Sequence, residues 1–155
     1  MTQRFELWRQ EDYLENFAFI DRDVMFIAVH ETNGRVDDED ELWERNTRNV
    51  EWVEGIINTF MDDDTRALVI FGNGRPLMNS NNDFYLGLAN VLYKLDVPVA
   101  YIHGNDADGD RSVTYKPYDM PGMDHVIAIQ SSRGGTNDLM RIHVGWDDTD
   151  PFIIG

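Results

Sequence analysis

Short apolar runs alternate with longer amphipathic segments along this chain. Residues 17–20 and 24–29 are apolar and flank the polar triplet Asp21-Arg22-Asp23. This pattern predicts two strands joined by a tight turn. Residues 67–71 form an apolar run rich in β-branched and aromatic side chains, which is typical of a buried strand. Further strands are predicted at residues 97–102, 125–130 and 139–146.

Two segments between these strands carry apolar residues at helical spacing. The first is predicted to begin after Asp37 or Asp38, either of which can cap a helix. It should end by Met61, because the acidic run at 62–64 is unfavourable at the negative end of a helix. The two apolar stripes are Trp43, Val50, Val53, Ile57 and Phe60 in the first helix, and Phe84, Leu88, Val91, Leu92 and Leu95 in the second.

The order strand, helix, strand, helix, strand predicts an α/β domain with parallel neighbours and two main helices around a mixed sheet. Residues 104–124 show no clear periodicity. Because no repeat or linker interrupts the pattern, residues 1–155 are interpreted as a single domain. No apolar run approaches the roughly 20 residues that a membrane span needs, so no membrane insertion is expected. The first residues show no secretory signal in this numbering, and the sequence does not indicate a compartment.

The chain is strongly acidic, with a net charge of -16. Such a surface repels nucleic acid and anionic membranes and favours basic partners and cations. Lys94 and Lys116 are the only lysines, a balance common in salt-adapted proteins, although a solvated acidic surface of no special meaning is the alternative. Because the chain has no cysteine, any metal would need oxygen or imidazole ligands.

Two strands run directly into polar loops that are candidates for chemistry. The run at 67–71 opens into Gly72-Asn73-Gly74, and the run at 97–102 opens into His103-Gly104-Asn105-Asp106. Loops at the carboxyl ends of parallel strands direct side chains into a shared cleft. The two loops are therefore expected to form one site.

The order of these segments resembles the second half of a calcineurin-like metallophosphoesterase domain. The resemblance rests on Glu15 to Phe19, Val24 to Val29, the helix with Trp43, Arg48, Asn49 and Trp52, Val69 to Pro76, Val99 to Gly104, and Gly134-Gly135 with the last strand. It implies an α/β sandwich of two sheets and a two-metal site. It also implies that the family's first three ligand motifs are absent from this chain.

The remaining two ligand motifs are substituted. The resemblance places a histidine where this chain has Asn73, and another just after Gly104, where Asn105, Asp106 and Ala107 stand. His103 is the best candidate for a residual ligand, and a strand-end histidine bonded to backbone is the alternative. Two-metal hydrolysis needs a bridging hydroxide between two well-ligated cations.

We therefore expect a non-catalytic structural or interaction subunit of a larger assembly. The alternative is a metal-dependent phosphoesterase, hydrolysing phosphomonoesters or phosphodiesters, completed by a partner chain that carries the missing ligands. Half of a sandwich should leave a sheet edge or apolar face open. A protein partner or a homo-oligomer is expected to cover it, unless the fold has closed on itself.

Three aspartates at alternate positions suggest a separate cation site. Asp106, Asp108 and Asp110 supply carboxylates at a spacing that suits calcium or magnesium. The loop departs from the EF-hand pattern, because Arg111 stands where glycine is needed and Pro117 where glutamate is needed. The alternative is a solvated acidic loop. No other cofactor is expected.

Overall fold

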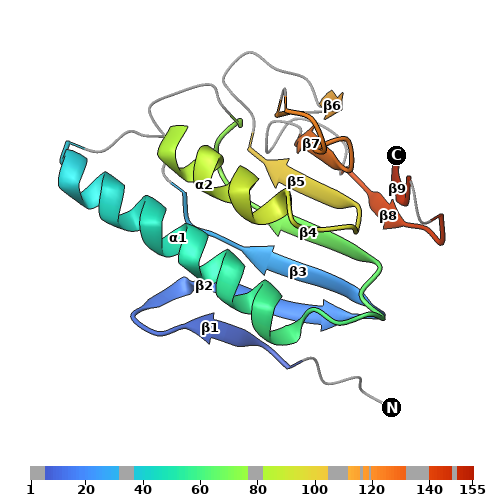
Figure 1. Ribbon diagram of the computed structural model, residues 1–155, viewed down its shortest axis with the longest axis horizontal. Coiled ribbons are helices and arrows are strands. Elements are labelled where there is room, and N and C mark those ends of the chain that lie inside the picture. Colours follow the sequence, from blue (N-terminus) through green and yellow to red (C-terminus); the bar gives the residue numbers. More distant parts are fainter. Residues whose placement is uncertain are drawn as a thin grey trace.

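A mixed β-sheet forms the centre of the computed structural model, with two helices on one face and a two-stranded sheet on the other (Figure 1). The structure describes residues 6–31, 37–76, 82–104, 112–115, 117–118, 120–131, 140–147 and 150–155. Within these residues the main sheet has seven strands in the order β1-β2-β3-β4-β5-β7-β6. The elements are β1 (Trp8–Gln10), β2 (Tyr13–Asp21), β3 (Val24–Ala28), α1 (Glu39–Phe60), β4 (Ala67–Phe71), α2 (Asn82–Leu92), β5 (Val99–His103), β6 (Ser112–Tyr115), β7 (Val126–Gln130), β8 (Ile142–Val144) and β9 (Phe152–Ile154).

The predicted hairpin is confirmed by β2 and β3, which pair antiparallel. Arg22 and Asp23 form its two-residue turn with φ values of 48° and 66°. Positive φ at both central residues is the pattern of a type I′ turn, whose twist matches that of the flanking strands. β1 was not predicted, because a strand of three residues is too short to show a period.

The centre of the sheet is parallel, as the sequence predicted. β3, β4, β5 and β7 pair in parallel, while β1 and β6 add antiparallel strands at the two edges. α1 connects β3 to β4 and α2 connects β4 to β5, and both helices cover the same face (Figure 1). The mixed α/β class with two helices is therefore confirmed.

The ends of α1 confirm their prediction. The Asp38 side chain accepts hydrogen bonds from the backbone amides of Asp40 and Glu41, and Met61 is the C-cap. The apolar stripe was wrong at its first position, because Trp43 is 62% exposed. The buried face at this end of the helix is formed instead by Asn46 and Asn49.

α2 and α1 enclose the larger core against the sheet. Phe84, Leu88, Val91 and Leu92 are buried as predicted, whereas the helix ends at Leu92 and Leu95 packs from the following turn. The described part of the chain contains no helix long and apolar enough to cross a membrane.

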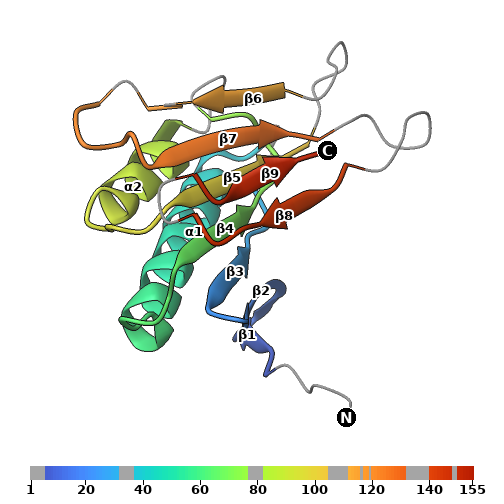
Figure 2. The same cartoon turned by 90° about the vertical axis from the view of Figure 1, so that its right-hand side faces the viewer.

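The opposite face of the sheet packs against β8 and β9 (Figure 2). The alternation predicted for the last strand is confirmed over its described part. Ile142 and Val144 pack against the sheet, and Arg141 and His143 are exposed. The strand itself is shorter than predicted. β6 and β9 were missed, and the turn predicted at 133–136 lies outside the described residues.

Candidate functional site

The carboxyl ends of the parallel strands meet at one edge of the sheet. Backbone hydrogen bonds continue past the strands, from Val29 N to Phe71 O at 2.9 Å and from Gly72 N to Ile102 O at 2.9 Å. Ser131 N donates likewise to His103 O at 2.9 Å. The residues that follow β3, β4, β5 and β7 are therefore held side by side, where α/β proteins usually place their sites.

Asn73 and Gly104, from the two predicted loops, are in direct contact. The Gly104 amide donates to the Asn73 carbonyl at 3.1 Å. A Cβ on Gly104 would lie 3.1 Å from the Asn73 carbonyl oxygen and 3.3 Å from its Oδ1, so glycine permits this close approach. The Asn73 side chain is exposed. The structure thus brings the two loops together and presents a neutral amide between them.

His103 is buried at the end of β5, with 4% of its surface exposed. Its Nδ1 lies 2.8 Å from the Gly104 carbonyl oxygen. Because a carbonyl only accepts, this contact requires a proton on Nδ1. The imidazole also stacks on the Tyr101 ring, with centroids 6.1 Å apart. This geometry matches the alternative considered for His103, a strand-end histidine bonded to backbone.

The remaining predicted site residues are not placed by the structure. Asn105, Asp106, Asp108 and Asp110 lie outside the described residues. Among the described residues, no group of three or more histidine, aspartate or glutamate side chains could hold a metal ion.

Glu31, which the sequence analysis did not single out, is the one fully buried carboxylate among the described residues. Its Oε2 accepts a hydrogen bond from the Gly74 amide at 2.5 Å. Glu31 continues the alternation of Met25, Ile27 and Val29, all buried, beyond the end of β3. A glutamate at the next position of an apolar alternation was the signal that could have revealed it.

Two tyrosines, Tyr85 and Tyr101, lie near this carboxylate, and a third, Tyr118, lies near those two within the larger core. Tyr85 comes from α2, Tyr101 from β5, and Tyr118 from the segment before β7, and each is at most 3% exposed. The Tyr85 and Tyr101 rings meet edge to face, with centroids 6.0 Å apart. The Tyr85 hydroxyl interacts with both the Glu31 carboxylate and the Tyr101 hydroxyl. The cluster therefore combines one carboxylate with three phenols in a space shielded from water.

Burial controls the ionisation of these phenols. It raises the pKa of Tyr85, Tyr101 and Tyr118 well above the usual value, because a phenolate is poorly solvated in the core. The negative charge of Glu31 raises the pKa of Tyr85 and Tyr101 further. The hydroxyls consequently stay neutral at ordinary pH and can donate and accept hydrogen bonds.

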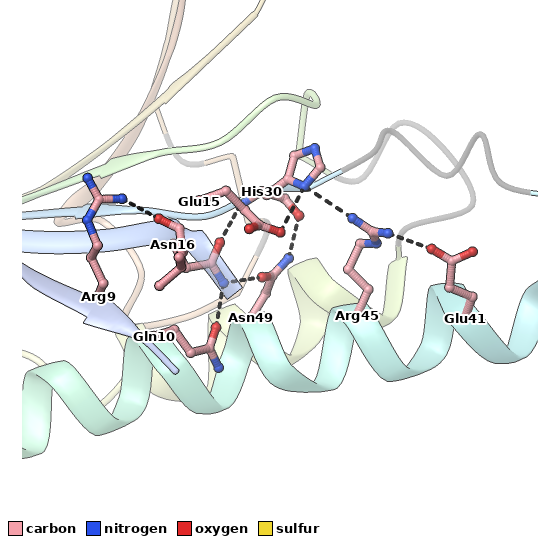
Figure 3. Close-up of polar contacts among 9 residues, drawn as sticks. Arg9, Gln10, Glu15, Asn16, His30, Glu41, Arg45 and Asn49 are labelled. Carbon is pink, nitrogen blue, oxygen red and sulfur yellow. Dashed lines mark hydrogen bonds and ion pairs between the residues drawn. The ribbon is translucent and has the colours of Figure 1, made fainter. Parts of the chain in front are cut away.

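A second buried polar network ties α1 to the N-terminal hairpin (Figure 3). Asn16 Nδ2 donates to Asn49 Oδ1 at 2.8 Å and to Gln10 Oε1 at 2.7 Å. Asn16 Oδ1 accepts from the His30 amide at 2.7 Å, and Asn49 Nδ2 donates to the His30 carbonyl at 3.0 Å. Both asparagines are almost fully buried. The network positions the chain that leads from β3 to Glu31.

At the exposed margin of this network, His30 lies between charges of opposite sign. Its Nδ1 is 3.1 Å from an Arg45 guanidinium nitrogen and 3.5 Å from Glu15 Oε1 (Figure 3). Arg45 also pairs with Glu41 one turn earlier on α1, at 2.5 Å. These exposed pairs orient side chains and contribute little to stability.

Comparison with known proteins does not assign the chain to a family. No family model, curated protein sequence or solved structure matches it.

Proposed function

We propose that this chain is a metallophosphoesterase-derived domain that serves as a non-catalytic structural or interaction subunit. The contact between Asn73 and Gly104 carries the proposal. It supports a common origin, because the two loops that would hold metal ligands in such a domain lie together at the carboxyl edge of the sheet. It also supports the loss of activity, because the group presented between them is a neutral, weakly basic amide.

The buried groups beside these loops favour a structural role. The Glu31 carboxylate accepts a hydrogen bond from the Gly74 amide, and the His103 ring donates one to the Gly104 carbonyl. Each contact fixes the backbone of one loop from inside the core. A metal centre would instead need several carboxylates and imidazoles directed at a shared point outside the core.

A manganese titration tests this proposal. We expect calorimetry to show no saturable Mn²⁺ binding that depends on Asn73 or His103, and N73A and H103A should titrate like the unmodified protein. Tight binding of two ions that either substitution abolishes would contradict the proposal. Such a result would favour the alternative, a phosphoesterase completed by a partner chain.

The proposal includes an oxygen-ligand site for calcium or magnesium at Asp106, Asp108 and Asp110. Carboxylates at alternate positions of the sequence support it, because hard cations take oxygen ligands. Calcium titration of the protein and of D106N/D108N/D110N tests it separately from the manganese experiment. The proposal predicts that calcium binding releases or absorbs heat with the unmodified protein and does not do so with the triple variant. Equal heats, or none at millimolar calcium, would remove this part of the proposal.

A further inference from the structure

The sheet face opposite the helices carries an aromatic stripe, defined here as Phe19, Phe26 and Phe71. Phe19 and Phe26 are cross-strand partners with ring centroids 4.7 Å apart, and Phe26 and Phe71 stack at 6.5 Å. Phe71 is 37% exposed and the other two are half-buried. Stacked, accessible rings on a sheet face are typical of a surface that another chain covers.

β8 presents an open edge beside this stripe. Among the described residues β8 pairs only with β9. Arg141 and Gly155 exchange two hydrogen bonds of 3.0 and 2.9 Å, and Gly145 N donates to Pro151 O at 2.7 Å. Bonded and non-bonded pairs alternate in an antiparallel ladder. Ile142 and Val144 therefore direct their amides and carbonyls away from β9, where they can pair with a further strand.

Within the described part of the chain, the unpaired edge of β8 faces the part of the sheet that β8 and β9 do not cover. An Arg66 guanidinium nitrogen donates to the Gly145 carbonyl, which ties the end of β8 to the start of β4. In Figure 2, β8 lies on the side of β9 that is nearer to β3. A strand added to β8 would lie about 4.8 Å further along, over β3, at the roughly 10 Å spacing of packed sheets. Its inward side chains would then meet the aromatic stripe at Phe26, which stacks on Phe19 on one side and on Phe71 on the other.

The surface beside one end of this edge is strongly acidic. Arg66 N donates to the Asp23 carbonyl at 2.9 Å, so Arg66 brings the β2–β3 turn close to the end of β8. Its guanidinium group also lies over the Trp146 ring, 4.3 Å from the centroid. The acidic residues at this end are Asp21, which ends β2, and the turn residues Asp23, Asp62, Asp63, Asp64, Asp147 and Asp150, against the two basic residues Arg22 and Arg66. A basic segment would be attracted to this end.

We propose that β8 and the aromatic stripe bind an extended segment of a partner protein by β-strand addition. The segment carries apolar side chains at alternate positions and lysine or arginine at the end beside Asp23. Main-chain hydrogen bonds to Ile142 and Val144 hold it, and the rings of Phe26 and Phe71 select its side chains. A second copy of this chain is disfavoured, because it would bring a net charge of -16 to an acidic surface.

This inference rests on the proposed function and names the kind of partner. The experiment uses the full chain and two synthetic peptides of alternating valine and threonine, one ending in lysines and the other in glutamates. Amide hydrogen exchange by NMR, with and without peptide, reports where each peptide binds. We expect the lysine peptide alone to bind, with new protection at Ile142 and Val144 and with affinity that falls as salt rises.

Two matched variants locate the binding surface. F71Q should weaken binding tenfold or more, since truncating an anchor in an interface typically costs at least about 1.4 kcal/mol. L86Q should leave the affinity unchanged, because Leu86 is 52% exposed but lies on α2, on the other face of the sheet. V144P provides a second test, because it removes an outward amide that makes no bond to β9.

Three results of the peptide experiment would overturn the inference: no binding of either peptide, equal binding of both, or binding that F71Q and V144P leave intact. A dimer seen by sedimentation and abolished by F71Q would also overturn it, by assigning the surface to a second copy. None of these outcomes bears on manganese binding near Asn73. Failure of this inference is therefore distinguishable from failure of the proposed function.

Discussion

The Glu31 carboxylate accepts a hydrogen bond from the Gly74 amide at 2.5 Å, which joins the chain after β3 to the loop after β4 inside the core. Both residues are buried. A buried carboxylate is costly unless it is hydrogen-bonded. The contact therefore fixes the loop that carries Asn73, and it requires a carboxylate to be buried in the core.

Removing this carboxylate should destabilise the protein. E31A should lower the free energy of unfolding by at least about 1.5 kcal/mol, because hydrogen bonds to charged groups contribute roughly 1.5–3 kcal/mol. E31Q should lower the free energy of unfolding by less than E31A does, since the glutamine amide oxygen can still accept a hydrogen bond from the Gly74 amide. Urea unfolding measures both. E51Q, at an exposed position of α1, is the control and should change stability by less than about 0.5 kcal/mol. Equal stabilities of E31A and E51Q would contradict the role of Glu31.

The asparagine pair between β2 and α1 should show strong coupling. N16A and N49A each leave buried hydrogen-bonding groups without partners. Each should therefore lower the free energy of unfolding by about 1–3 kcal/mol. The double variant should lose less stability than the two single variants added together, because both substitutions remove the same 2.8 Å hydrogen bond between Asn16 and Asn49. Additive losses in a double-mutant cycle would show that the network does not act as a unit.

Two glycine-to-alanine substitutions should have opposite effects. A Cβ at Gly72 would lie 1.9 Å from the Tyr101 hydroxyl oxygen, so G72A should destabilise the protein. Y101F should rescue part of the loss by removing that oxygen. G55A is the matched control, because a Cβ added at Gly55, in the middle of α1, would have nothing within 4 Å. It should stabilise the protein by roughly 0.5–1 kcal/mol, as thermal unfolding can show. A G72A protein as stable as G55A would contradict the packing of Tyr101 against Gly72.

Alkaline pH should destabilise the fold through its buried tyrosines. Burial raises the pKa of Tyr85, Tyr101 and Tyr118 above the value of 10.0 that applies in the unfolded chain. The folded state therefore holds more protons above about pH 10, and stability falls as the pH rises further. Phenolate absorbance should show that these three residues ionise only on unfolding. Complete ionisation of all six tyrosines in a folded protein would contradict their burial.

Periodicity revealed much of the fold because the central elements are long or strongly patterned. The hairpin, both helices and the parallel strands follow from apolar spacing, and Asp38 and Met61 marked the ends of α1. Strands of three or four residues, such as β1, β6 and β9, are too short for a period to emerge. Trp43 was misplaced because a polar network, rather than apolar packing, fills the start of the helix face.

The candidate site was predictable only in part. Parallel strands bring their loops together, so the contact between Asn73 and Gly104 followed from the topology. The role of Glu31 and the three tyrosines did not follow, because they come from separate segments that meet only in the folded core. A polar residue within an apolar alternation indicates such a cluster but does not identify its partners.

Metal-dependent hydrolysis tests the central claim most directly. The substrates are p-nitrophenyl phosphate and its bis-ester, with manganese, zinc or nickel, and the protein is compared with N73A. The account predicts no turnover above that of the metal alone, and no difference between the two proteins. Metal-dependent turnover that N73A abolishes would contradict it and would identify the chain as a working phosphoesterase.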